Sequence, residues 1–477
     1  MGEIKMAPRS GFSAARQFAS ISASKATLEL LRRSGRGGTA APGLVALQID
    51  PEVVSRIARK LPEGAVVVAG TNGKTTTSRM IADIIEASGL RVIHNRSGSN
   101  LARGVAATFV QQSSLTGEPQ GQIAVIESDE AALPEILRLV KPRLLVLNNL
   151  FRDQLDRYGE LDTIGQKWKV ALAALPATTR LIVDVDDPTL ANITSELTAP
   201  RTSFGLSAPE HKLSELPHAA DSAVCRKCGA DLTYNELYLG HLGDWVCRSC
   251  GFTRPRLDVV GSDIRLDAMA SLTMTVRSGD QALRDVTVQV PGIYNAYNVT
   301  AAVATAFALG ISPEAVRTAL LQFQSPFGRA ERVSFDGREI SIALVKNPVG
   351  FNEVLRTITG GGSELAAPTL IVINDEFADG RDVSWLWDVD FEMLAAGTLP
   401  IATAGIRGAD MANRLKYAGV DESRLIPLDG PIDQALTAFL EKTRNAPEVS
   451  ILPTYTAMLA VREALGNAGA VDRFWEE

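Results

Sequence analysis

The segment Gly70–Thr77, Gly-Thr-Asn-Gly-Lys-Thr-Thr-Thr, has the residue types and spacing of a loop that binds phosphate groups. Its glycines let backbone N–H groups close on phosphate oxygens, and the start of the following helix adds positive potential. In such a loop Lys74 would bridge the β- and γ-phosphates of a nucleotide, and the Thr75 hydroxyl would hold Mg²⁺. The predicted phosphate-binding residues are Gly70, Thr71, Asn72, Gly73, Lys74, Thr75 and Thr76.

The residues around this loop predict a strand before it and a helix after it. Ala65–Ala69 is an apolar run typical of a buried parallel strand, and apolar residues then recur at helical spacing at positions 80, 81, 84 and 85. Strand, glycine turn and helix form the context expected for a nucleotide-binding loop. Val68 stands where the general pattern has a further glycine, so the loop is a variant. The alternative is an ordinary strand-to-helix turn.

All four cysteines of the chain belong to two Cys-x2-Cys pairs. Each pair can supply two thiolates from one tight turn, and two such turns complete a tetrahedral Zn²⁺ site. The predicted ligands are Cys225, Cys228, Cys247 and Cys250. Two disulfides or four reduced core cysteines are the alternatives. Because four thiolates leave no position for substrate, the metal is expected to fold a short segment, residues 221–256. The nearby histidines, at positions 211, 218 and 241, are expected at the surface rather than as ligands.

Composition restricts the class of protein. The chain has 477 residues, enough for two or three domains, and its net charge of −7 argues against a protein that coats nucleic acid. No apolar stretch is long enough to span a membrane and no signal-peptide core is present, so a cytoplasmic protein is expected. Residues 1–36 contain several basic and few acidic side chains. They fit a transit peptide, a helix on a membrane surface or, as we favour, a helix packed on the first domain.

The order of patterns along the chain predicts an α/β protein with two sheets. After a loop at residues 37–43, strands expected at 123–126, 143–147 and 181–183 alternate with helices, as in a doubly wound sheet. Residues 262–291 then predict antiparallel strands, followed by a helix over 299–309. Further strands are expected at 339–345, 369–373, 399–403 and 449–452. The predicted domains are a helical and loop segment (1–45), a central domain with the cysteine insertion (46–325) and a C-terminal Rossmann-like domain (326–477).

The variant phosphate loop resembles that of the Mur ligase superfamily, which includes the peptidoglycan amino-acid ligases and folylpolyglutamate synthetase. The resemblance implies a Mur ligase-like central ATPase domain that uses ATP and Mg²⁺ to phosphorylate a carboxylate. It also implies that Glu127 coordinates Mg²⁺ and that Asn295 and Asn298, in a Gly-x-x-Asn-x-x-Asn stretch, contact adenine. Arg329 matches a linker arginine that could touch a phosphate on domain closure. The alternative for Glu127 is a solvated acid at the end of a strand, and the alternative for Asn298 is a helix N-cap.

Other segments depart from the amino-acid ligases of this superfamily. Gln154 stands where those ligases have a histidine near the metal, and Trp168 stands where many have a lysine that is carbamylated. These departures and the cysteine pairs resemble the MurT branch of the superfamily. The segments that carry this resemblance are 153–160, 225–250, 346–348, 374–388 and 454–458.

This resemblance implies the synthetase subunit of lipid II isoglutaminyl synthase, a carbon–nitrogen ligase of peptidoglycan synthesis. ATP would activate the α-carboxyl of D-glutamate in the stem peptide of lipid II, and ammonia would convert the acyl phosphate to D-isoglutamine. The ammonia would come from a partner glutamine amidotransferase of the GatD type, since zinc would leave this chain no cysteine nucleophile. The protein is then expected in the cytoplasm, with a peripheral position at the inner membrane face as one option.

In this family the C-terminal domain is thought to complete the partner's Cys-His pair with an acid. Asp388 is the first candidate, followed by Asp379 and Asp382, and the alternative is that these acids cap helices or pair with Arg381. Trp385 or Trp387 is expected at the partner interface. The expected catalytic residues are Lys74, Glu127 and Asp388.

Two other functions compete with this interpretation. A Mur or folylpolyglutamate-type ligase would join an amino acid in place of ammonia, and Gln154 and Trp168 argue against it. A zinc-ribbon NTPase that binds nucleic acid would need a basic face, but residues 221–256 are only mildly basic. An inactive ATPase is disfavoured because Lys74, Thr75 and Glu127 are all present.

Overall fold

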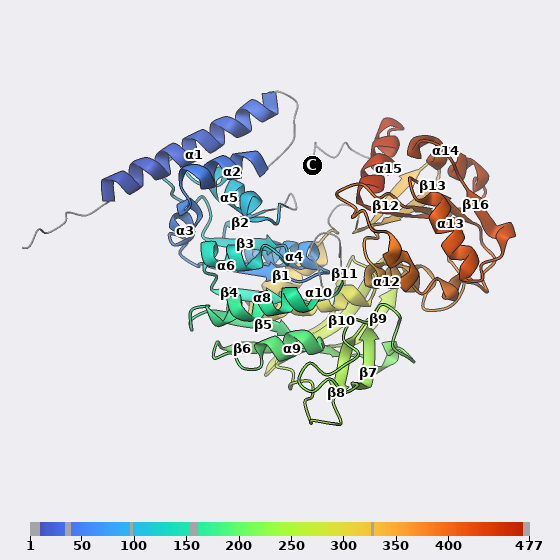
Figure 1. Cartoon of the computed structure of the whole chain (residues 1–477), viewed down its shortest axis with the longest axis horizontal. Coiled ribbons are helices and arrows are strands. Elements are labelled where there is room, and N and C mark those ends of the chain that lie inside the picture. Colours follow the sequence, from blue (N-terminus) through green and yellow to red (C-terminus); the bar gives the residue numbers. More distant parts are fainter. Residues whose placement is uncertain (1–9, 34–39, 96–98, 153–160, 326–328, 471–477) are drawn as a thin grey trace, which may run out of the picture.

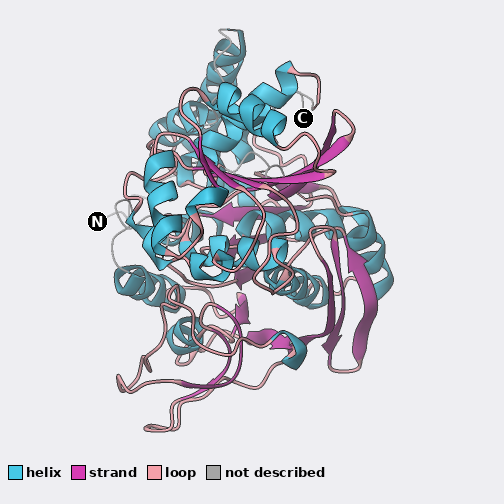
Figure 2. Cartoon of the chain, turned by 90° about the vertical axis from the view of Figure 1, so that its right-hand side faces the viewer, coloured by secondary structure: helices cyan, strands magenta, loops and turns pink. Residues whose placement is uncertain are grey.

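A computed structural model describes residues 10–33, 40–95, 99–152, 161–325 and 329–470. Figure 1 shows two α/β units side by side, and Figure 2 shows helices packed around the strands of both. The first unit is built on a nine-stranded sheet and the second on a six-stranded sheet. We propose a domain border near residue 325, because the last strand of the first sheet ends at Val288 and the first strand of the second begins at Arg329.

The nine-stranded sheet has the order β11-β10-β9-β6-β5-β4-β1-β3-β2. From β2 to β9 all neighbouring strands are parallel, whereas β9, β10 and β11 pair antiparallel. The predicted strands and the predicted antiparallel segment are therefore present. The bounds are β1 (Ala65–Ala69), β2 (Val92–His94), β3 (Ile123–Ser128), β4 (Leu144–Leu147), β5 (Arg180–Asp184), β6 (Arg201–Ser207), β9 (Val259–Asp267), β10 (Ser271–Ser278) and β11 (Gln281–Val288).

Helices cover both faces of this sheet, so its central strands are apolar on both sides. In β1, Val66 and Val68 pack into one core, while Ala65, Val67 and Ala69 pack into the other. The first core contains α4 (Lys74–Ala87), α10 (Ile293–Ala308) and α11 (Pro313–Gln322). The second contains residues of α1 (Ser10–Arg33), α2 (Ala40–Ile49), α3 (Val53–Ala58), α5 (Ala102–Gln111), α6 (Leu133–Val140), α8 (Leu161–Ala173) and α9 (Pro188–Thr194).

Two expectations about local structure are wrong. The predicted loop at 37–43 is helical from Ala40, because Gly43 allows close helix packing: a Cβ there would lie 1.6 Å from the Arg103 carbonyl oxygen. The helix expected from 299 begins at Ile293, directly after Gly292, whose positive φ of 79° ends the preceding segment. Asn298 therefore lies inside the helix and is not its N-cap.

The cysteine segment is inserted between β6 and β9, which are neighbours in the sheet. It follows a short 3-10 helix, η1 (Pro209–His211), and contains the antiparallel hairpin β7 (Thr233–Leu239) and β8 (Leu242–Val246). In Figure 1 this hairpin lies at the lower edge of the first unit, below α12 (Pro348–Ile358) of the second. Hereafter residues 221–256 are called the ribbon, and Leu239–Leu242 the hairpin tip.

The six-stranded sheet has the order β12-β13-β17-β14-β15-β16, with only β12 antiparallel to its neighbour. Its strands are β12 (Arg329–Phe335), β13 (Arg338–Ala343), β14 (Thr369–Val372), β15 (Ile401–Ala404), β16 (Leu425–Pro427) and β17 (Glu448–Pro453). Its helices are α12 (Pro348–Ile358), η2 (Ser384–Asp388), η3 (Phe391–Leu394), α13 (Gly408–Tyr417), η4 (Glu422–Arg424), α14 (Ile432–Lys442) and α15 (Tyr455–Asn467). Within the described ranges, no helix has the length and apolarity needed to cross a bilayer.

Candidate functional site

The glycine-rich turn lies between β1 and α4, at the carboxyl edge of the parallel strands. Gly73 is the N-cap of α4 with a φ of 79°, a conformation that glycine adopts without strain. A Cβ at this position would lie 2.0 Å from the Asn298 side-chain oxygen. The turn thus requires glycine for two reasons, its backbone conformation and the close approach of α10.

Hydrogen bonds fix the turn to the ends of neighbouring strands. The Asn72 N–H donates to the Asn149 side-chain oxygen over 2.8 Å, and the Asn149 amide donates to the Asn72 carbonyl over 3.2 Å. The Thr71 hydroxyl donates to the Phe151 carbonyl over 3.1 Å and accepts from the Phe151 N–H over 3.0 Å. Because both partners follow β4, this strand sets the shape of the loop.

Asn295 and Asn298 lie in the first turns of α10 and are both buried. The Asn298 side chain accepts from the Thr77 hydroxyl over 3.1 Å and donates to the Asn295 side-chain oxygen over 2.8 Å. Thr77 in turn accepts from the Asn148 amide over 2.9 Å. The two asparagines that are expected near the nucleotide base therefore lie beside the phosphate loop. The hydrogen bond from Thr77 of α4 to Asn298 connects them to it.

Lys74 forms a buried ion pair with Glu130 in this structure. Its ammonium lies 2.8 Å from Glu130 Oε2, and the two side chains are only 8% and 3% exposed. Burial alone would raise the pKa of Glu130, but the Lys74 charge, aided by Lys346, holds that pKa below its usual value. Glu130 was not selected from the sequence, although its place three residues after Glu127, beyond the end of β3, was a usable signal.

The two predicted Mg²⁺ ligands lie nearby in the fold. Glu127 is buried near the end of β3, and its Oε1 accepts weakly from the Asn100 amide at 3.4 Å. Thr75 follows Lys74 in the first turn of α4 and is partly exposed. Trp168 is fully buried, and its indole N–H donates to the Glu130 carbonyl over 2.8 Å. The tryptophan thus supports the segment that carries both acids.

A pocket extends from the phosphate loop to the second unit. Its empty volume, which includes open solvent at its mouth, is about 890 Å³. Asn347 bridges the two units, since its amide donates to the Asn72 side-chain oxygen over 2.9 Å while its own oxygen caps α12. The lining residues include Asn72, Gly73, Thr76, Asn149, Leu239, Leu242, Tyr294, Asn295, Tyr297, Asn298, Lys346, Val349 and Glu353.

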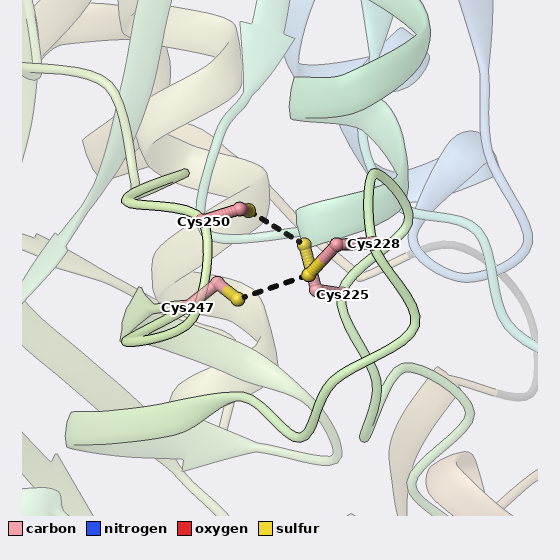
Figure 3. Close-up of side chains that lie close together, drawn as sticks. All are labelled: Cys225, Cys228, Cys247 and Cys250. Carbon is pink, nitrogen blue, oxygen red and sulfur yellow. Dashed lines mark hydrogen bonds between the residues drawn. The ribbon is translucent and has the colours of Figure 1, made fainter.

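The four cysteines come together at the base of the hairpin (Figure 3). All four Sγ atoms lie within 4.8 Å of one another, with separations of 3.6 Å for Cys225–Cys250 and 3.5 Å for Cys228–Cys247. A tetrahedral Zn²⁺ with bonds of about 2.3 Å requires sulfur separations of about 3.8 Å, so the arrangement fits the metal. None of the four forms a disulfide.

The histidines of this region are not part of the cysteine cluster. His218 is exposed and lies 2.8 Å from Asp390 of the second unit. His241 is fully buried, contrary to the expected surface position, because it packs at 4.3 Å between ring centroids against Phe151. Its Nε2 lies 3.5 Å from an Asp187 oxygen.

The three acids proposed for the partner's site have different surroundings. Asp388, in η2, is 40% exposed, and its Oδ2 lies 3.4 Å from the Arg152 guanidinium. Asp379 is buried and accepts from the Thr456 and Glu376 backbone N–H groups, while Asp382 accepts from the Ser384 N–H. Asp379 and Asp382 thus accept hydrogen bonds from nearby backbone N–H groups, whereas the partly exposed Asp388 carboxylate contacts the Arg152 side chain.

Of the two tryptophans near these acids, Trp387 is 54% exposed and Trp385 packs on the core of the second unit. The segment 153–160, which includes Gln154, lies outside the described residues, as do Phe327 and Gly328. Arg329 begins β12, but only its backbone is described.

Models of known protein families match residues in both units. Residues 68–231 match the Mur ligase middle domain, and residues 344–458 match the MurT ligase C-terminal family. The chain is 33% identical to the lipid II isoglutaminyl synthase (glutamine-hydrolyzing) subunit MurT of Streptococcus pneumoniae, over 92% of this chain and 94% of the relative. It is 30% identical to the Staphylococcus aureus subunit of the same name, over 95% and 98%.

Among solved structures, a pseudomurein peptide ligase type C from Methanothermus fervidus superposes with a TM-score of 0.65 at 20% identity. The match covers 87% of this chain and 80% of that one. At this identity the likeness shows a shared Mur ligase fold. The full-length identity to the MurT subunits goes further and shows that the chain belongs to the MurT family.

Proposed function

We propose that this chain is the synthetase subunit of a lipid II isoglutaminyl synthase. It would use ATP to activate the α-carboxyl of D-glutamate in the stem peptide and then amidate the acyl phosphate with ammonia to give D-isoglutamine. The observation that carries this proposal is the full-length likeness to two MurT subunits, combined with an assembled phosphate loop at the mouth of an interdomain pocket. With this substrate, the protein would work at the cytoplasmic face of the membrane.

The described residues support activation of a carboxylate. A carboxylate is a poor electrophile, and ATP with Mg²⁺, the cofactors of the Mur ligase family, supplies a phosphoryl group that converts it to an acyl phosphate. We assign Lys74 and the loop N–H groups to neutralising the transferring phosphoryl, and Thr75 and Glu127 to the metal. Lys346 supplies a second positive charge near Glu130 from the second unit.

We propose that Asn295 and Asn298 contact the adenine of the nucleotide. Arg329 would contact a phosphate when the two units close. Asn347 holds the second unit against the phosphate loop, which would help to exclude water from an acyl phosphate. The four-cysteine site is assigned to Zn²⁺, with a structural role, because all four ligand positions are taken by thiolates.

The ammonia source is assigned to a separate glutaminase subunit of the GatD type. The name of the relatives, a subunit of a glutamine-hydrolyzing synthase, supports a partner. With its four cysteines clustered at the ribbon, this chain keeps no thiol for glutamine hydrolysis. Asp388 would orient the partner's imidazole, because its side chain is 40% exposed and is not committed to a helix cap. To do so it would have to share or leave Arg152.

The test uses the purified chain with ATP, Mg²⁺, ammonium and lipid II, and reads the mass of the stem peptide. We expect one carboxyl to become an amide, and Lys74→Ala to abolish the conversion. With a GatD-type partner and glutamine in place of ammonium, Asp388→Asn should lose amidation but keep the ammonium-driven reaction. Asp382→Asn is the matched control, since the Asp382 carboxylate is nearby but accepts from the Ser384 N–H at the start of η2.

The second candidate is a Mur or folylpolyglutamate-type ligase. It is favoured by the fold alone, which this chain shares with such ligases. ATP turnover that depends on an amino acid, with no amide formed from ammonium, would support that candidate and exclude the amidation.

A further inference from the structure

The hairpin tip of the ribbon reaches the pocket that the proposed function assigns to ATP. We propose that the ribbon is part of the nucleotide site: its tip supplies an apolar wall for the purine base, and the metal holds this wall against the second unit. The inference rests on the proposed function only in taking the pocket as a nucleotide site.

The first observation is the position of the tip in the pocket. Leu239 and Leu242 line it together with Gly73 and Thr76 of the phosphate loop and Tyr294 of α10. Leu239 keeps 4% of its surface exposed, whereas Leu242 is fully buried behind it in the same core, so Leu239 is the tip residue that can contact a base. With the phosphates of a nucleotide held at the loop, its base would occupy the rest of the pocket, whose lining includes this leucine and Tyr294. A flat aromatic base is the part of ATP that apolar side chains bind best.

The second observation is that the tip lies between the two units. Gly240, at a φ of 54°, has so little room that a Cβ would lie 2.7 Å from the Phe151 ring and 3.5 Å from Val349 of α12. One residue earlier than Leu239, the Tyr238 carbonyl accepts from the Arg356 guanidinium of α12 over 2.9 Å. The tip therefore fills the space between Phe151, which follows β4, and Val349 of α12.

The third observation concerns what holds the hairpin in place. A two-stranded hairpin is marginally stable by itself. Cys247 follows β8 directly, and its knuckle is closed by a 2.9 Å hydrogen bond from Gly251 N–H to the Cys247 carbonyl. Between the knuckle and the tip, the Trp245 indole donates to the Val185 carbonyl over 3.2 Å. Metal binding at the base would add to these contacts by joining Cys225, which precedes the hairpin, to Cys247, which follows it.

The buried end of the hairpin also contacts the acids that follow β5. The Gly243 N–H donates to the Asp186 carbonyl over 3.1 Å, and the Arg254 guanidinium lies 2.9 Å from Asp186 Oδ1. Tyr297 of α10, another pocket residue, donates its hydroxyl to Asp186 Oδ2 over 2.9 Å. One aspartate therefore joins the ribbon to the helix that lies opposite the leucines.

The experiment compares two probes that share phosphates but differ in the base. The dissociation constants of ATP and of inorganic tripolyphosphate, both with Mg²⁺, are measured by calorimetry on the full chain. Leu239→Ala should weaken ATP about tenfold and leave tripolyphosphate within about twofold, because only ATP reaches the wall. Val224→Ala, in the ribbon beside Cys225 but outside the pocket lining, is the matched control and should change neither.

Removal of the metal with a chelator should have the same selective effect, and added Zn²⁺ should restore ATP affinity. Equal affinities of Leu239→Ala and the unchanged protein for ATP would overturn the inference, as would a parallel loss for both probes. If chelation unfolds the chain, the Leu239 variant decides, since it keeps all four cysteines. Failure of the unchanged protein to bind ATP would instead overturn the proposed function.

Discussion

Glu130→Gln tests the inference that Lys74 is kept ready for phosphate by a buried counter-charge. The substitution preserves the shape of the side chain and the backbone carbonyl that accepts from Trp168. It removes the negative charge 2.8 Å from the Lys74 ammonium, in a place where both side chains are less than a tenth exposed. The nucleotide-free chain would then contain a buried lysine whose nearest counter-charge is gone.

The expected cost follows from that burial. Removing one partner of a buried ion pair typically destabilises a protein by about 3–5 kcal/mol, because the remaining charge is desolvated without compensation. The Thr71 carbonyl, 3.2 Å from the ammonium, still accepts a hydrogen bond, so we expect the lower end, about 3 kcal/mol. For a unit of about 280 residues that corresponds to a midpoint lower by roughly 5 °C.

ATP should reverse much of this loss, since its phosphates would replace the missing negative charge at Lys74. Thermal unfolding is therefore recorded with and without ATP and Mg²⁺ for the unchanged protein, Glu130→Gln and Lys74→Met. The rise in midpoint on adding ATP should be larger in Glu130→Gln than in the unchanged protein, and absent in Lys74→Met. A Glu130→Gln midpoint within about 2 °C of the unchanged protein, or an equal rise with ATP, would refute the reasoning.

Two further predictions concern residues around the pocket. Gly73→Ala should lower ATP affinity by more than about tenfold, because its Cβ would lie 2.0 Å from the Asn298 side-chain oxygen and the positive φ would be strained. Gly89→Ala, with a φ of 91° and open space around it, is the control that carries strain alone. Calorimetry of ATP binding to the two variants distinguishes the two effects. Burial raises the pKa of Asp186 to about 6 despite Arg254, so in the folded chain this acid binds a proton more readily than in the unfolded chain. Its contribution to stability is then present at low pH and decreases as pH rises from about 4 to about 6, by at most about 3 kcal/mol. The free energy of unfolding of the unchanged protein minus that of Asp186→Asn should fall across this window in denaturant titrations, and a flat or rising difference would contradict the assignment.

The nucleotide loop could be predicted because its signal is local. Gly70–Lys74, the apolar strand before it and the helix after it are consecutive in sequence, and the structure contains each of them in that order. The zinc-ligand pattern is local in the same way, since two tight knuckles can be recognised from four cysteines alone. Strand positions in both sheets were likewise visible, because strands buried on both faces form continuous apolar runs.

Features that depend on tertiary contacts could not be predicted in this way. His241 was expected at the surface, yet it is buried against Phe151, a residue 90 positions earlier in the chain. The helix at Ala40 replaces an expected loop because Gly43 serves close packing on α5, and glycine in sequence does not distinguish packing from turning. The pairing of Glu130 with Lys74 could not be predicted, since only the fold shows which acid reaches that ammonium.

The ribbon illustrates the same limit for function. From the sequence, Leu239 and Leu242 resemble the apolar residues that any small hairpin buries, and the cysteines indicate only that a metal folds the segment. Insertion between β6 and β9 places the hairpin beside the start of α10, and the six-stranded unit then closes on it through Arg356 and Val349. A leucine that would be structural in an isolated ribbon therefore becomes part of a pocket wall. Because the wall is formed by three segments distant in sequence, only a perturbation that separates base binding from phosphate binding can reveal its role.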